Sequence, residues 1–143
     1  MNQVEGACHC GNIRLLLELS KSLSNYRPSA CDCDFCSKHG ASYISDPLGS
    51  LRIKVAKSQD LGRYRQGDGI AECLFCKECG VLVGVLFQEQ GHLFATANSA
   101  SLVAPESFGD KRVVSPKQLA ASEKVAVWKK FWFSDVTLAA DGG

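Results

Sequence analysis

The sequence predicts an all-β, zinc-binding domain of short strands with one helix near its C-terminus. Three observations lead to this prediction. Most apolar residues occur in short runs that are separated by glycine, proline, aspartate or asparagine. A run of good helix formers that could make several turns occurs at residues 119–130. The cysteines are crowded at intervals of two and three residues, which suits metal binding better than disulfide bridges between distant strands.

The first half of the chain contains three predicted strands. Residues 6–19 have the composition of a turn that leads into a strand, and the polar residues 20–29 predict a loop. A short strand is expected at residues 41–44. Residues 51–55 alternate apolar and polar side chains, which predicts a half-buried strand.

A hairpin and two further strands are predicted in the second half. Residues 61–65 and 70–75 flank the segment 66–69, whose two glycines can adopt positive φ in a tight turn. The hydrophobic residues 81–87 and the residues 93–97 predict two further strands.

The helix near the C-terminus has a recognisable start. Ser115 followed by Pro116 is typical of an N-cap and a first helical position. We expect the helix to continue over residues 119–130, with Trp128 and Phe131 on its buried side. A last strand at residues 135–138 and a frayed Gly-Gly end are predicted to follow.

Length and charge limit the functional classes. A chain of 143 residues fits one domain, here 1–143, and it carries 16 basic against 15 acidic residues. This near-neutral composition does not indicate the clustered basic surface that binding to nucleic acid or to an anionic membrane requires. Neither is expected as a partner. Small neutral or weakly charged ligands, or protein partners, fit better, and the sequence does not indicate an oligomeric state.

The 8 cysteines raise the question of compartment, because an even number can indicate a disulfide framework in a secreted protein. Residues 1–6 lack the basic and apolar regions of a signal peptide. The longest apolar run, residues 81–87, is too short to cross a membrane. We therefore expect a cytoplasmic protein with reduced thiols.

One predicted zinc site is centred on the close thiols Cys31, Cys33 and Cys36. Thiolates this close repel one another unless a cation or protons neutralise them, and Zn²⁺ is the usual cation. These residues make up three-quarters of a tetrahedral site, and its fourth ligand has to come from elsewhere. His39 could orient a ligand or move a proton, although a surface histidine is the simpler interpretation.

A second predicted site is a zinc knuckle formed by Cys76, Cys79 and Gly80. A knuckle supplies two ligands. Cys8 and Cys10, at strand spacing, would place both sulfurs on one face and supply the other two. Cys73 then remains for the first cluster. Spacing alone permits other partitions, such as placing Cys73 with the knuckle.

Three motifs together resemble the glutathione-dependent formaldehyde-activating family, which also includes centromere protein V. They are Gly6-Ala-Cys-His-Cys-Gly-Asn-Ile-Arg14, Cys31-Asp-Cys-Asp-Phe-Cys36 with Gly40, and Phe75-Cys-Lys-Glu-Cys-Gly80. The matching motifs lie within residues 3–102, and the helix and tail at 115–143 follow them. The resemblance implies a β-tent of short antiparallel strands with zinc-ribbon knuckles.

The resemblance also implies two Zn²⁺ ions per chain. A structural zinc would be held by Cys8, Cys10, Cys76 and Cys79, and a second zinc by Cys31, Cys33 and Cys36, with Cys73 as the predicted fourth ligand. In the founding activity the second site condenses glutathione with formaldehyde to S-hydroxymethylglutathione, which is a carbon–sulfur lyase reaction in reverse. Cys31, Cys33 and Cys36 are then the catalytic centre, with a small-molecule thiol and an aldehyde as partners.

Two alternatives to the enzyme remain open from sequence. The chain could be a non-enzymatic zinc module for protein binding or scaffolding, or it could carry out thiol redox chemistry, which bound zinc would suppress. An accessible pocket that reaches the second site and has a basic rim would favour the enzyme. A glutathione site needs donors for two carboxylates, and the candidates are Arg14, Arg27, Lys38 and Arg63.

Overall fold

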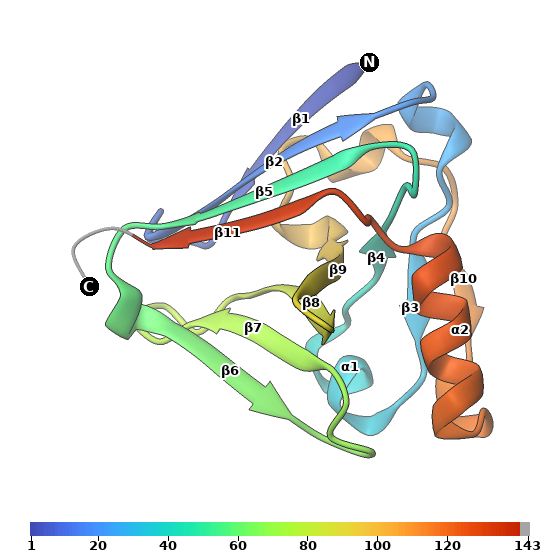
Figure 1. Cartoon of the computed structure of the whole chain (residues 1–143). Helices are drawn as coiled ribbons and strands as arrows, with labels where there is room; N and C mark the ends of the chain where they lie inside the picture. Colours follow the sequence, from blue (N-terminus) through green and yellow to red (C-terminus); the bar gives the residue numbers. More distant parts are fainter. Residues whose placement is uncertain (141–143) are drawn as a thin grey trace.

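Two twisted β-sheets form the body of the molecule (Figure 1). The sheets lie close together on one side of the molecule and diverge toward the other side. The computed structural model describes residues 1–140. The first sheet has the order β1-β2-β5-β11 and consists of β1 (Asn2–Ala7), β2 (Ile13–Leu19), β5 (Ser50–Val55) and β11 (Val136–Ala140). Strands β1, β2 and β5 are antiparallel, whereas β11 runs parallel to β5.

The second sheet is larger and has the order β10-β3-β4-β9-β8-β7-β6. Its pairs are antiparallel except for β10 and β3, which run parallel. The strands are β3 (Ser29–Cys31), β4 (Tyr43–Ile44), β6 (Leu61–Arg65), β7 (Glu72–Cys76), β8 (Leu82–Glu89), β9 (His92–Asn98) and β10 (Arg112–Val114).

The mostly-β fold predicted from sequence is confirmed, with one difference: two of the strand pairs are parallel. The two parallel pairs arise because segments distant in sequence add to the sheet edges: β11 reaches β5 only after the C-terminal helix. The hairpin of β6 and β7 has the expected tight turn, in which Gly67 and Gly69 adopt φ of 60° and 71°.

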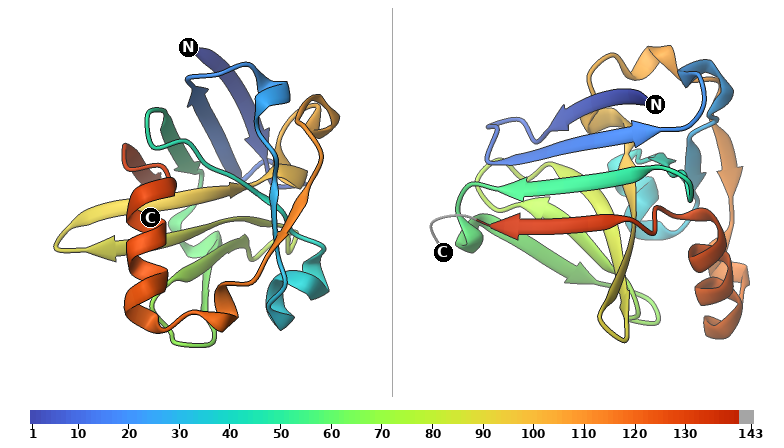
Figure 2. Two further views of the ribbon diagram at one scale, coloured as in Figure 1. Left: turned by 90° about the vertical axis from the view of Figure 1, so that its right-hand side faces the viewer. Right: turned by 45° about the horizontal axis from the view of Figure 1, so that its top comes forward.

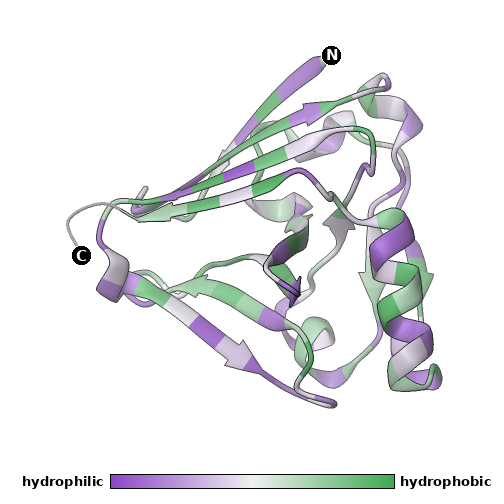
Figure 3. Cartoon of the chain, in the orientation of Figure 1, coloured by the Kyte–Doolittle hydropathy of each residue, from purple (hydrophilic) through white to green (hydrophobic). Residues whose placement is uncertain are grey.

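The main core lies between the two sheets. Along β2 every second residue is buried, and Ile13, Leu17 and Leu19 have no exposed surface. Figure 3 shows the same alternation of hydrophobic and hydrophilic residues along the strands of the first sheet. Leu74 and Val83 meet them from the second sheet. Full burial of such a side chain stabilises the fold by roughly 1.5–3 kcal/mol.

There are two α-helices in residues 1–140, and only the second was predicted. The short α1 (Asp34–His39) contains part of the first cysteine cluster. Its signals in the sequence are Asp34 in the first turn and Gly40 just after the last, where φ is 62°. Neither helix is long and apolar enough to span a bilayer.

Helix α2 (Ala121–Phe131) begins five residues after Pro116, where the sequence predicted its first helical position. Pro116 instead starts a separate 3₁₀ turn, and the Ser115 hydroxyl donates to a carboxylate oxygen of Asp32 at 2.5 Å without capping a helix. The predicted burial of Phe131 is wrong, because its side chain is 53% exposed. Trp128 is half-buried.

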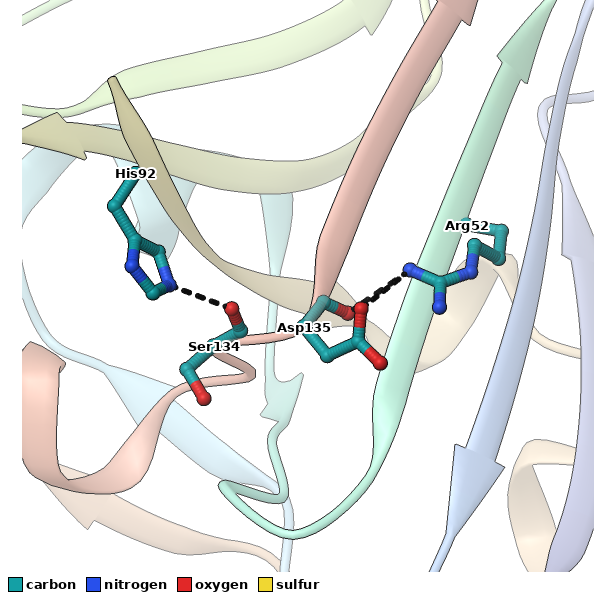
Figure 4. Close-up of polar contacts among 4 residues, drawn as sticks. All are labelled: Arg52, His92, Ser134 and Asp135. Atoms are coloured by element: carbon teal, nitrogen blue, oxygen red, sulfur yellow. Dashed lines mark hydrogen bonds and ion pairs between the residues drawn. The ribbon is translucent and has the colours of Figure 1, made fainter.

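Residues 133–135 attach the C-terminal part of the chain to both sheets. Phe133 is fully buried, and its backbone exchanges two hydrogen bonds with Ala95. His92 Nε2 donates to the Ser134 carbonyl at 2.7 Å, and Arg52 pairs with Asp135 at 2.8 Å (Figure 4). This attachment fixes the end of α2. The predicted frayed Gly-Gly end lies outside the described residues.

Candidate metal centre and cavity

The sulfurs of Cys8, Cys10, Cys76 and Cys79 lie within 4.8 Å of one another. Cys10 Sγ is 3.7 Å from Cys8 Sγ and 3.6 Å from Cys76 Sγ. The structure therefore brings together the four residues expected to form the structural site. The prediction that Cys8 and Cys10 share one face of a strand is wrong, because both residues lie in the turn after β1.

Backbone groups support this first site. Gly80 has φ of 81°, as expected for a knuckle, and its N–H donates to the Cys76 carbonyl at 2.7 Å. The Ile13 N–H donates to Cys8 Sγ at 3.2 Å. Burial raises the pKa of the Cys79 thiol, but hydrogen bonds from the backbone of Cys10 and Val81 outweigh it and lower this pKa to about 6. These donors favour the thiolate that a metal requires.

Cys31, Cys33 and Cys36 form the second cluster, with sulfurs that also lie within 4.8 Å of one another. Cys31 ends β3, Cys33 precedes α1 and Cys36 lies within α1. The Cys33 sulfur accepts the Cys36 N–H at 3.4 Å, so the helix start fixes the positions of two of the three thiols. A hydrogen bond from the Cys36 thiol, against the effect of burial, lowers the pKa of Cys31 to about 6.

Cys73 lies near this second cluster but outside the group of three close sulfurs. It is buried on β7 and packs in the same apolar cluster as Cys36, Tyr43 and Val85. Burial raises its pKa to about 11, and the nearby Cys33 and Cys31 add to the effect. Its role as the fourth ligand stays a prediction. His39 is exposed, and its ring lies tilted against Phe35, with ring centroids 4.6 Å apart.

A cavity of about 1100 Å³ reaches the second cluster. Cys31, Cys33, Cys36 and Cys73 all line it. Its other walls come from β3, β10, the turn between β6 and β7, and α2. Figure 2 shows α2 and the β3–β10 pair on opposite sides of the open face of the molecule. The cysteine group expected to be catalytic is therefore accessible to a small molecule.

The cavity is strongly basic although the chain is nearly neutral. Two acidic residues line it, Asp46 and Asp68, against six basic residues: Lys21, Arg27, Arg112, Lys117, Lys124 and Lys130. Of the four basic candidates from sequence, the structure places Arg27 in the lining and the other three outside it. Sequence reasoning missed the other five, because they are distant in sequence and no local motif joins them.

The turn of the β6–β7 hairpin lies across one side of the cavity. Asp68 in this turn pairs with Lys124 of α2, with 2.7 Å between the carboxylate oxygen and the ammonium. Gln66 Nε2 lies 3.8 Å from the sulfur of Cys33. The turn therefore contacts both the helix wall and the second cysteine cluster.

The donor sets suit zinc. Thiolates are soft ligands that favour Zn²⁺, and four close sulfurs match its tetrahedral preference in structural sites. Both clusters of described residues could therefore bind metal ions. The first has a full set of four protein ligands, whereas the second combines three thiols with an adjoining cavity.

Comparison with known proteins identifies the family. The model of the glutathione-dependent formaldehyde-activating enzymes matches residues 3–117. The chain belongs to this family. The matched region contains both cysteine clusters and Cys73, whereas α2 and β11 lie beyond it.

A solved structure supports the fold. The crystal structure of a Rhodobacter sphaeroides protein is 29% identical in sequence and superposes with a TM-score of 0.58. The similarity covers 77% of this chain and 99% of that one. No curated protein matches the chain. Family membership supports glutathione-dependent formaldehyde activation in general as the relevant chemistry.

Proposed function

We propose that this protein joins a glutathione-like thiol to formaldehyde or another small aldehyde at the second cysteine cluster, as a carbon–sulfur lyase acting in the direction of synthesis. The observation that carries the proposal is the basic cavity that reaches Cys31, Cys33 and Cys36. Membership of the glutathione-dependent formaldehyde-activating family also supports the proposal. The reaction forms a bond between sulfur and the carbonyl carbon and moves the thiol proton to the carbonyl oxygen.

Two Zn²⁺ ions per chain are part of the proposal. Cys8, Cys10, Cys76 and Cys79 would hold one, and Cys31, Cys33 and Cys36 the other, with Cys73 as the predicted fourth ligand. A zinc ion at the second cluster would lower the pKa of a thiol and favour the nucleophilic thiolate. With Cys73 as fourth ligand, a substrate thiol would have to displace one protein thiolate or add a further ligand to the metal, and the cavity beside the three close thiols gives it access.

The chain's own residues would bind and orient the substrates. Lys21, Arg112 and Lys117 line the cavity and form no ion pair within residues 1–140, so they are available for the carboxylates of a peptide thiol. The turn at residues 66–69 would limit water around the reacting atoms. Holding both reactants together in this way replaces a slow encounter in solution.

A non-enzymatic zinc module is less well supported. A buried metal with four sulfurs and no cavity would favour such a module, whereas this site adjoins a cavity with six basic residues in its lining. Thiol redox chemistry is also disfavoured, because bound zinc suppresses the oxidation of its ligands.

The test is an NMR exchange measurement that follows formaldehyde and glutathione adduct formation with and without the zinc-loaded protein. Exchange should accelerate in proportion to protein concentration, and the Cys36→Ser variant should lose the acceleration. Val113→Ala is the control, because Val113 is 74% exposed and lies outside the cavity lining. No acceleration with any of several thiols and aldehydes would favour the module.

A further inference from the structure

Helix α2 has an apolar side that packs poorly against the protein. None of its residues is buried, although it contains two valines, a tryptophan and a phenylalanine. Val127 is 40% and Phe131 53% exposed, and both line the cavity together with Trp128 and Trp132. A helix of a small domain normally buries such a stripe against the core. Here the stripe forms a wall of the cavity instead.

The wall presents two stacked indole rings close to the second cysteine cluster. The indole rings of Trp128 and Trp132 stack with 4.9 Å between centroids and 20° between planes, and Phe87 supports Trp128 from β8. Trp132 packs against the apolar cluster that contains Cys36 and Cys73. An apolar group attached near the reacting carbon would therefore reach the indoles.

Most basic and aromatic residues of the lining come from different segments. Arg112 lies on β10, and Arg27 and Lys21 lie between β2 and β3, whereas the aromatic residues lie on α2 or directly after it. The two cavity lysines of α2 already have partners: Lys124 pairs with Asp68, and Lys130 lies 5.3 Å from the centre of the Phe131 ring. The lining therefore suits a ligand with anionic groups at one end and a flat apolar group at the other.

From this division we infer that the aldehyde used by this protein carries an aryl substituent, which lies against Trp128, Phe131 and Trp132. The inference rests on the proposed function and specifies its carbonyl substrate. The aromatic wall lies in residues 127–132, beyond residues 3–117, which the family model matches. The thiol sulfur bonds to the carbonyl carbon, the C=O π bond breaks, and the thiol proton ends on the oxygen.

Binding of two stable adduct mimics to the zinc-loaded protein tests the inference. S-benzylglutathione and S-methylglutathione share the anionic part and differ in the group attached to sulfur, whose first carbon stands for the former carbonyl carbon. Calorimetry should show at least tenfold tighter binding of the benzyl compound. The benzyl compound should also quench tryptophan fluorescence, which comes from Trp128 and Trp132 alone because the chain has 2 tryptophans.

Two variants locate the effect. Phe131→Ala changes a largely exposed side chain and should weaken binding of S-benzylglutathione several-fold while S-methylglutathione binds as before. The matched control Val113→Ala should change neither affinity. Equal affinities for the two compounds, or an equal loss of both in Phe131→Ala, would overturn the inference and leave the proposed function standing. Failure of both compounds to bind would overturn the inference and the proposed function together.

Discussion

The hydroxyl oxygen of Tyr43 lies 3.2 Å from the sulfur of Cys36 in a buried position next to the second cysteine cluster. Tyr43 is 8% exposed and comes from β4, the strand beside β3 in the second sheet. Burial, with the charge of Cys36 adding to it, raises the pKa of Tyr43, so its hydroxyl remains protonated and can donate to a thiolate. Tyr43 is thus a positioning residue for the second site.

Removal of this hydroxyl should weaken the second metal site. In Tyr43→Phe we expect the affinity of that site for zinc to fall by about 10- to 100-fold, since groups that hydrogen-bond to metal ligands typically contribute this much. Chelator competition monitored with a metal indicator measures the loss, and the first site should keep its affinity. Tyr64→Phe is the control, because the Tyr64 ring is 49% exposed and stacks on Phe35 instead. Equal losses in the two variants would contradict the role of Tyr43.

The two cysteine clusters should differ in what their loss does to the fold. Cys76 is fully buried, and its site joins residues distant in sequence, so Cys76→Ser should unfold the domain. Cys36→Ser affects a cluster confined to residues 31–36 and should leave a folded protein that lacks one metal ion. Circular dichroism and metal analysis distinguish these outcomes.

Wild-type protein should contain about two zinc ions per chain, and a single ion would contradict the two-site assignment. Cys73→Ser tests the predicted fourth ligand. If Cys73 binds the second ion, the variant will hold that ion more weakly than wild type in the chelator competition.

Tyr26 should give stability that is lost at alkaline pH. Its hydroxyl donates to a carboxylate oxygen of the buried Asp46 at 2.6 Å. Burial, with this hydrogen bond, raises the pKa of Tyr26 above 10.0. Tyr26→Phe should therefore lower the free energy of unfolding by about 1.5–3 kcal/mol near neutral pH, as for hydrogen bonds to charged groups.

The sign of the pH effect follows from the unfolded state. Above pH 10.0 the unfolded chain loses the Tyr26 proton before the folded chain does, which favours unfolding. The difference between wild type and Tyr26→Phe should be constant below that pH and shrink as the pH rises through the folded pKa. Urea denaturation at several alkaline pH values measures it, and Tyr64→Phe is again the control. A difference that stays constant to high pH would contradict the hydrogen bond's contribution.

Local motifs in the sequence predicted the cysteine sites better than the strand arrangement around them. The knuckle formed by Cys76, Cys79 and Gly80 is recognisable because a tight turn with a glycine at positive φ is a property of a few adjacent residues. The grouping of Cys8 and Cys10 with it was also predicted, although they lie in a turn. Helix α1 was missed because six residues are too few for a periodic pattern.

Distant contacts limited the prediction of the cavity. The parallel pairing of β10 with β3 places Arg112 and Lys117 on the same cavity as Cys31, from segments about eighty residues apart in sequence. Helix α2 was predicted, but its periodic pattern did not show whether its apolar side met the core or a cavity. Phe131 was assigned to the core for that reason.

By itself the sequence determined the eight thiols, the short strands, the helix near the C-terminus and the family, because each depends on adjacent residues or on motif order. The division of the thiols into two sites followed from the family resemblance, since spacing alone left other partitions open. Only the tertiary structure decided the electrostatics and shape of the site. Six basic side chains and two stacked indoles come to one cavity beside Cys31, Cys33 and Cys36 through sheet pairing and helix attachment. Such convergence depends on long-range burial and strand register, which no local pattern specifies.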